Sequence, residues 1–170
     1  LMTGSKMEQE LKSVVQLAKK AAIEYYKLTK KPLGITGEIG ELIAASELDL
    51  ELAKPRTIGY DAEKEGIRYQ IKTRANHKKT KSFYNQRTSK INIEADWDKL
   101  VLVLLDDNYE LTELAVFDKE KITKELQKPG SRARSETYCF ILSFILVSGL
   151  VVSNYKRSSV SSSIPNKARV

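Results

Sequence analysis

The sequence has almost no cysteine and almost no histidine. Cys139 is its single cysteine and His77 its single histidine. A lone cysteine excludes an internal disulfide and a cysteine-based zinc site within the chain, and it fits a reducing cytoplasm, which is the expected location. His77 has no second histidine with which to share a metal ion, so an exposed loop position is expected.

The composition is that of a soluble globular protein. Hydrophobic residues make up 41% and charged residues 30% of the 170 positions, enough for one compact domain with its own core. The net charge of +7 favours an anionic partner, without choosing between a nucleic acid and a membrane surface. We expect a single domain over residues 7–153, preceded by a cloning scar at 1–6 and followed by a disordered, serine-rich basic tail at 154–170.

One long hydrophobic run lies near the C-terminus, over residues 139–152. Counted from Tyr138 it has 15 residues, fewer than the ~20 that cross a bilayer as a helix, and two serines and a glycine interrupt it. A buried strand pair or a core helix is therefore favoured, and a membrane partner is not expected. A C-terminal anchor stays open, and with it a function as a membrane-tethered scaffold.

Apolar residues at helical spacing predict three helices. The first covers 8–29, and its lysines are expected on the solvated face. Its apolar face is expected to consist of Leu11, Val14, Val15, Ala18, Ala22, Tyr25 and Tyr26. The second runs from about 37 to 48, with Thr36 as its N-cap. A connection that contains Pro55 is expected to follow over residues 49–58. A third, short helix is expected at 119–127, capped by Asp118. The lysines of the first helix are Lys12, Lys19, Lys20 and Lys27.

The strongest strand signal is the run Lys99–Leu105, which is apolar after its first residue. Continuous apolar character indicates burial on both faces, hence a central strand. A turn at 106–108 and a partner strand at 109–117 follow, and the adjacent aspartates of that turn are explained by turn chemistry rather than metal binding. With the helices, these strands predict an α/β fold.

A tight β-hairpin is predicted between Gly59 and Arg74. Gly66 is the expected turn residue, and the residues after it alternate apolar and polar, as in a half-buried strand. The alternation places Gln70 and Lys72 on one face, which Asp61 also reaches if the two strands are antiparallel. Such a group can hold a divalent metal ion beside a phosphate. Alternatively, Asp61 is only a turn former, and Lys72 is a surface lysine paired with Glu63 or Glu65.

Two glutamates on the second predicted helix, Glu38 and Glu41, are three residues apart and therefore neighbours on one face. Glu38 is explained equally well as an acid favoured by the helix dipole. Glu41 lies deeper in the helix beside apolar positions, which favours a functional role.

The stretch from Thr73 to Lys90 is rich in basic residues and contains no acidic one. Single-signed charge interleaved with aromatic residues is typical of contact with a nucleic-acid backbone. The candidate contact residues are Arg74, His77, Lys78, Lys79, Lys81, Tyr84, Arg87 and Lys90.

A glutamate-bearing helix, an aspartate at the start of a hairpin, and Gln70-Ile71-Lys72 on the next strand resemble the PD-(D/E)XK nuclease superfamily. The resemblance covers roughly residues 34–117. It implies a restriction-endonuclease-like core, in which a helix, a three-stranded meander, a helix and a further strand form a mixed central sheet flanked by helices. It also implies hydrolysis of phosphodiester bonds with Mg²⁺ or Mn²⁺.

The resemblance assigns a role to each candidate residue. Asp61, Gln70, Lys72 and Glu41 would be catalytic, with Lys72 as the catalytic lysine. The metal ligands would be Asp61, Gln70, Glu41, the backbone carbonyl of Ile71, and Glu38 as an accessory.

Two positions depart from the superfamily pattern. Tyr60 replaces the usual proline before the aspartate, and Gln70 stands where an acidic residue is usual. An amide oxygen can ligate magnesium, but the site gives up a negative charge. The main hypothesis is a restriction- or repair-type endonuclease acting on double-stranded DNA. The alternative is a nuclease-like protein that binds nucleic acid without cutting it. A homodimer stays open, since no dimer surface is evident in the sequence.

Overall fold

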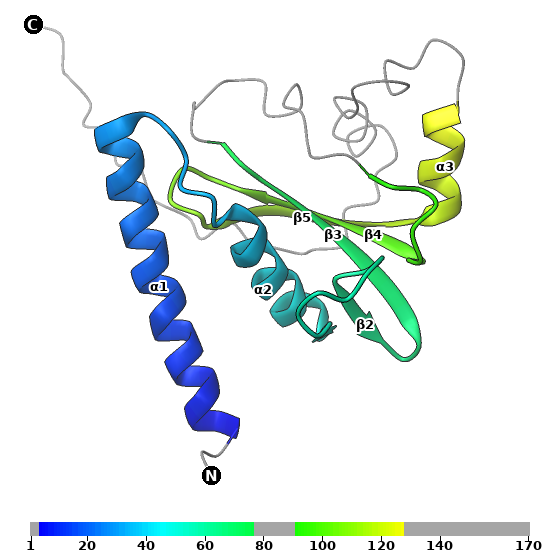
Figure 1. Cartoon of the computed structure of the whole chain (residues 1–170), viewed down its shortest axis with the longest axis horizontal. Helices are drawn as coiled ribbons and strands as arrows, with labels where there is room; N and C mark the ends of the chain where they lie inside the picture. The colour runs from blue at the N-terminus through cyan, green and yellow to red at the C-terminus, as the bar shows by residue number, and fades with distance from the viewer. Residues whose placement is uncertain (1–3, 77–90, 128–170) are drawn as a thin grey trace, which may run out of the picture.

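The computed structural model describes residues 4–76 and 91–127. They form an α/β fold built on a mixed sheet of five strands in the order β1-β2-β3-β4-β5 (Figure 1). The elements, in chain order, are α1 (Gly4–Thr29), α2 (Thr36–Leu48), β1 (Glu51–Leu52), β2 (Ala62–Lys64), β3 (Ile67–Ala75), β4 (Lys99–Leu105), β5 (Leu111–Asp118) and α3 (Lys119–Gln127).

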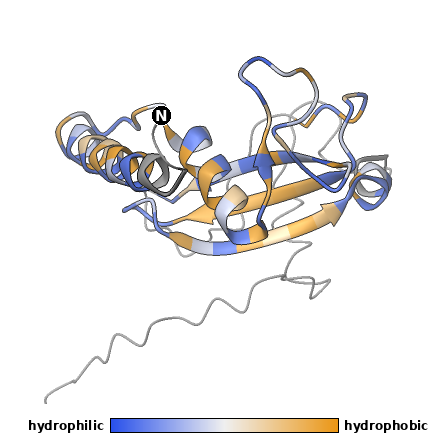
Figure 2. Ribbon diagram, turned by 90° about the horizontal axis from the view of Figure 1, so that it is seen from below, coloured by the Kyte–Doolittle hydropathy of each residue, from blue (hydrophilic) through white to orange (hydrophobic). Residues whose placement is uncertain are grey.

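The sheet is antiparallel except between β3 and β4, which run parallel. From Leu100 to Leu105 every residue of β4 is buried, because one apolar cluster covers each face of the sheet (Figure 2). The prediction that Lys99–Leu105 is a central strand is confirmed, with the same bounds.

Helices flank the sheet on both faces. On one face α2 contributes Ile39 and Ala44 to the first cluster, and α1 contributes Ala22. On the other face α3 contributes Ile122, which packs with Trp97 in the second cluster. This arrangement confirms the predicted α/β class with a mixed, helix-flanked sheet.

The packing of α1 differs from the prediction. Leu11, Val14 and Tyr25 were expected on its buried face, but they are exposed. Lys19 was expected in solvent, but it is buried, and its Nζ donates a hydrogen bond to Oε1 of Glu110 at 2.9 Å. Lys19 therefore links α1 to the β4–β5 turn through this ion pair.

Three further local predictions are corrected. Thr36 is the first residue of α2 rather than its cap, since its hydroxyl pairs with the buried Tyr109 and Ile35 takes the N-cap position. Tyr109 lies in the turn before β5 rather than in the strand. The expected connection after α2 contains the short strand β1, which pairs with β2.

The turn at 106–108 is confirmed, as is its chemistry. Oδ1 of Asp106 accepts hydrogen bonds from the backbone N–H groups of Asn108, at 2.8 Å, and Glu110, at 2.9 Å. Among the helices described here, none has the length and apolar character needed to cross a membrane. The hydrophobic run at 139–152 and the tail at 154–170 lie outside the described residues.

Candidate functional site

The hairpin between β2 and β3 sets the geometry of the site. Glu65 and Gly66 have φ angles of 52° and 79°, the left-handed pair typical of a two-residue type I′ turn. This turn fixes the antiparallel register in which Ala62 faces Tyr69. Asp61 directly precedes β2, and its N–H donates to the carbonyl of Tyr69 at 2.8 Å. The predicted hairpin, with Gly66 in its turn, is confirmed.

The side chain of Asp61 also bonds to β3, one step further along the strand than its backbone does. Oδ2 of Asp61 accepts a hydrogen bond from the N–H of Ile71 at 2.7 Å and another from Nε2 of Gln70. The carboxylate thus takes the place of a strand partner for β3. Both hydrogen bonds end on one oxygen, and Oδ1 has no hydrogen-bond partner among the described residues.

The edge of β3 is open where the carboxylate meets it. Within the described chain, pairing of β2 with β3 reaches no further than Tyr69. Backbone groups of alternate residues in a strand point to the same side, so the carbonyl of Ile71 faces this edge, as do the backbone groups of Tyr69. A carboxylate oxygen and a peptide carbonyl are therefore directed to the same place.

Helix α2 brings Glu41 to this edge by an unusually close approach. A Cβ added to Gly40 would lie 1.8 Å from Oγ1 of Thr73, so only glycine lets the helix backbone rest against β3 at this point. Gly40 is buried, and the next residue, Glu41, is half-buried beside the strand. The glycine was not identified from the sequence, because a close contact with a distant strand leaves no local signal.

The pKa of Glu41 responds to the charges of three neighbouring side chains. Burial raises the pKa of its carboxyl group, the negative charges of Asp61 and Glu38 raise it further, and the ammonium of Lys72 acts in the opposite direction. Asp61 and Lys72, from the hairpin, are therefore close enough to Glu41, from α2, to influence its charge. Among the described residues, Lys72 forms no ion pair with Glu63 or Glu65.

The metal-binding role of Gln70 stays a prediction, and the structure shows only which partner its side chain has without metal. Its side chain lies on the same face of β3 as Lys72, as predicted, because both residues face alternate positions of β4, Leu100 and Leu102. Its amide group, however, donates a hydrogen bond to Asp61. If the amide turned by 180°, its oxygen would face the carboxylate of Asp61. The two oxygens would repel each other unless a cation lay between them.

The donor set fits a hard divalent cation in chemical type. Two carboxylates and a peptide carbonyl are oxygen ligands of the kind that magnesium and manganese prefer. A bound cation would offset the repulsion between the negative charges of Glu41 and Asp61. No three acidic, cysteine or histidine side chains of the described chain lie close enough together to form a metal cluster by themselves. The carbonyl of Ile71 and bound water would have to complete the coordination.

Most of the predicted nucleic-acid contacts cannot be placed. Arg74 is exposed near the end of β3, on the same face as Gln70 and Lys72. The remaining seven residues lie outside the described part of the chain, and they are His77, Lys78, Lys79, Lys81, Tyr84, Arg87 and Lys90.

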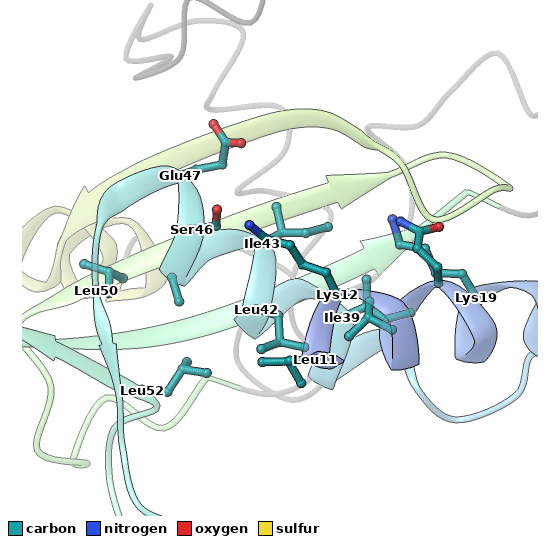
Figure 3. A pocket seen from close by; sticks show the side chains of 13 residues that line it. Leu11, Lys12, Lys19, Ile39, Leu42, Ile43, Ser46, Glu47, Leu50 and Leu52 are labelled. Atoms are coloured by element: carbon teal, nitrogen blue, oxygen red, sulfur yellow. The ribbon is translucent and has the colours of Figure 1, made fainter. Parts of the chain in front are cut away.

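A separate cavity of about 550 Å³ lies between α1 and the α2–β1 region. Its lining is mostly apolar and includes Leu11, Ile39 and Leu42, with Lys12 and Lys19 at its side (Figure 3). None of the predicted site residues lines it. The sequence did not reveal this cavity, since its walls come from elements that are far apart in the chain.

Comparison with known proteins adds no family to this picture. A scan against protein-family models found no match, and a search of the curated proteins found none either. The function is therefore argued from the geometry of the chain itself.

Proposed function

We propose that this protein is a cytoplasmic, metal-dependent nuclease that hydrolyses phosphodiester bonds in double-stranded DNA. The observation that carries the proposal is that the charges of Asp61 and Lys72 both act on the half-buried carboxyl group of Glu41, while Asp61 is hydrogen-bonded to the edge of β3. Glu41 comes from α2, Asp61 directly precedes β2, and Lys72 comes from β3. Packing of α2 on the sheet needs neither a half-buried carboxyl group nor a second acid beside it.

The order of the elements supports a restriction-endonuclease-like core. Helix α2 is followed by the antiparallel meander β1-β2-β3, and β4 then lies parallel to β3. The helix that such a core places between β3 and β4 would fall within residues 77–90, which lie outside the described chain.

Each residue has a role that its position supports. Asp61, Glu41 and the carbonyl of Ile71 would hold the ion, with Glu38 as an accessory acid. A bound magnesium ion supplies neutralisation of phosphate charge and a lower pKa for the attacking water. Lys72 would orient that water or stabilise negative charge on the phosphate. Arg74 continues the same face toward the DNA backbone.

Cleavage of plasmid DNA in magnesium or manganese tests the proposal. Asp61→Asn and Lys72→Ala should each lower the cleavage rate by at least ~100-fold, since each removes a group that acts on the reacting phosphate. Glu120→Gln and Lys124→Ala are matched controls, because these two residues form an exposed ion pair on α3. Both variants should cleave DNA at the wild-type rate. Cleavage that is equally fast in all four variants would refute the proposal.

A second candidate function is supported by the position of the Gln70 amide. Its hydrogen bond to Asp61 occupies the carboxylate with a neutral donor, as expected of a nuclease-like protein that binds nucleic acid without cutting it. Titration of DNA binding with manganese separates the two functions. A binding-only protein should bind DNA equally well with and without the ion, whereas a nuclease should bind more tightly when the ion is present.

A further inference from the structure

Helix α1 carries an apolar stripe that is exposed to solvent except at Ala18, which is half-buried. Val14 is 60% exposed and Leu28 is 85% exposed, values far above those of the apolar side chains in the core. The stripe consists of Leu11, Val14, Ala18, Ala21, Tyr25 and Leu28. In Figure 1, α1 lies at one side of the molecule, beside the sheet rather than under it.

The spacing of this stripe is that of a coiled-coil seam. Its members alternate three and four residues apart through the whole series, which is a strict seven-residue repeat. The face that α1 turns toward the sheet is a different one, with Ala22 fully buried and Ile23 packed beside it. Apart from Leu11, which also lines the cavity beside α2, the seam is therefore additional to the apolar face that the fold itself uses.

We propose that the seam is the interface of a homodimer in which two copies of α1 pair antiparallel. About a two-fold axis at the middle of the stripe, Leu11 of one copy meets Leu28 of the partner subunit. In the same register Val14 meets the partner's Tyr25, and Ala18 meets the partner's Ala21. Large side chains thus face large ones at both ends, and small ones face small ones at the centre, where the helices can approach closely.

Charge at the ends of the seam supports the antiparallel direction. Glu10 flanks the seam near its N-terminal end, and Lys31 follows its C-terminal end; both are exposed. An antiparallel pair sets each Glu10 near the partner's Lys31. A parallel pair would instead bring like charges together at both ends.

The extent of the seam sets the strength of the dimer. From Leu11 to Leu28 the helix advances roughly 26 Å at about 1.5 Å per residue. One helix face of this length is at the small end of specific interfaces, so dissociation in the micromolar range, on the order of 1–100 μM, is expected.

Sedimentation equilibrium of the full chain over a range of concentrations tests the proposal. The wild-type protein should dimerise, and Val14→Glu and Leu28→Glu should each raise the dissociation constant by about tenfold or more, because each puts a charge into the seam. Both sites are exposed, so neither change should alter the circular dichroism spectrum. Ile58→Glu is the matched control: this residue is 93% exposed and lies far from α1 in sequence, so it should dimerise like the wild type.

The direction and register have their own test. Glu10→Lys should weaken the dimer, and adding Lys31→Glu to it should restore the dimer, since the exchanged charges face each other only in the antiparallel pair. A wild-type chain that stays monomeric at 100 μM or more, on the order of the weakest expected affinity, would overturn the proposal. So would a dimer that neither seam variant weakens, including the case in which another segment of the same chain covers the stripe.

Discussion

At the scale of single residues, Gln70 decides how strongly the site attracts a cation. Gln70→Glu adds a third carboxylate to those of Asp61 and Glu41, so the affinity for manganese should rise by at least ~10-fold, as expected for one added negative ligand. Without metal the variant should be less stable than the wild type, because a repulsive pair replaces a hydrogen bond. Thermal unfolding with and without manganese measures both effects.

Gln70→Met is the matched control for that change. It removes the amide without adding charge, so its melting temperature should respond to manganese no more than that of the wild type. A Gln70→Glu variant whose manganese response equals that of Gln70→Met would contradict the placement of the cation beside Asp61.

Gly40 is the residue on which the position of Glu41 depends. Gly40→Ala should lower the free energy of unfolding by about 1–3 kcal/mol, since the added methyl group meets Thr73 and pushes α2 from the sheet. Gly37→Ala, in the same helix with open space around it, should instead raise the free energy by roughly 0.5 kcal/mol. Urea denaturation compares them, and equal effects would mean that the close contact is not a constraint.

At the scale of elements, the β2–β3 turn sets the register that places Asp61 against Ile71. Glu65 adopts a left-handed conformation there, which asparagine tolerates much better than glutamate. Glu65→Asn should therefore raise the free energy of unfolding by about 0.5–1 kcal/mol without changing cleavage. Thermal unfolding measures the gain. Gly66→Ala should change the free energy of unfolding in the opposite direction. It should lower it by about 1 kcal/mol or more, because Gly66 occupies the second left-handed position of the turn.

The elements also show what the sequence could and could not predict. The strand Lys99–Leu105 was predicted with its observed bounds, because continuous apolar character needs no knowledge of its partners. β1 was missed, since two residues carry no periodic pattern. The side of α1 that packs on the sheet was misjudged because helical spacing shows that apolar residues share a face, not what covers it.

The same limit applies to the site. Asp61, Gln70 and Lys72 could be placed together from strand alternation and hairpin pairing, both of which are local. Glu41 joins them only through the contact of Gly40 with Thr73, residues 33 positions apart in the chain. Its position beside apolar residues favoured a functional role, and the resemblance assigned it to the site, but the geometric reason is visible only in the fold.

At the scale of the whole molecule, two carboxyl groups link stability to pH. Burial raises the pKa of Glu113, and burial together with neighbouring acids raises that of Glu41. In the pH range between the ordinary and the raised pKa, the folded state binds more protons than the unfolded chain. Their contribution to the free energy of unfolding therefore falls as pH rises through that range, and it stays unfavourable at neutral pH.

Replacing each of these groups with glutamine distinguishes a carboxyl group of the proposed metal site, Glu41, from one whose pKa is raised by burial alone, Glu113. Glu41→Gln and Glu113→Gln should both flatten the decline of stability with rising pH and raise the free energy of unfolding at pH 7, because each removes a carboxylate that folding disfavours. Manganese should distinguish them. A cation bound by the folded state raises the melting temperature, so Glu113→Gln should keep the wild-type increase. Glu41→Gln should lose most of it, because the ion would lose one of its two charged ligands. An unchanged increase in Glu41→Gln would place the cation elsewhere.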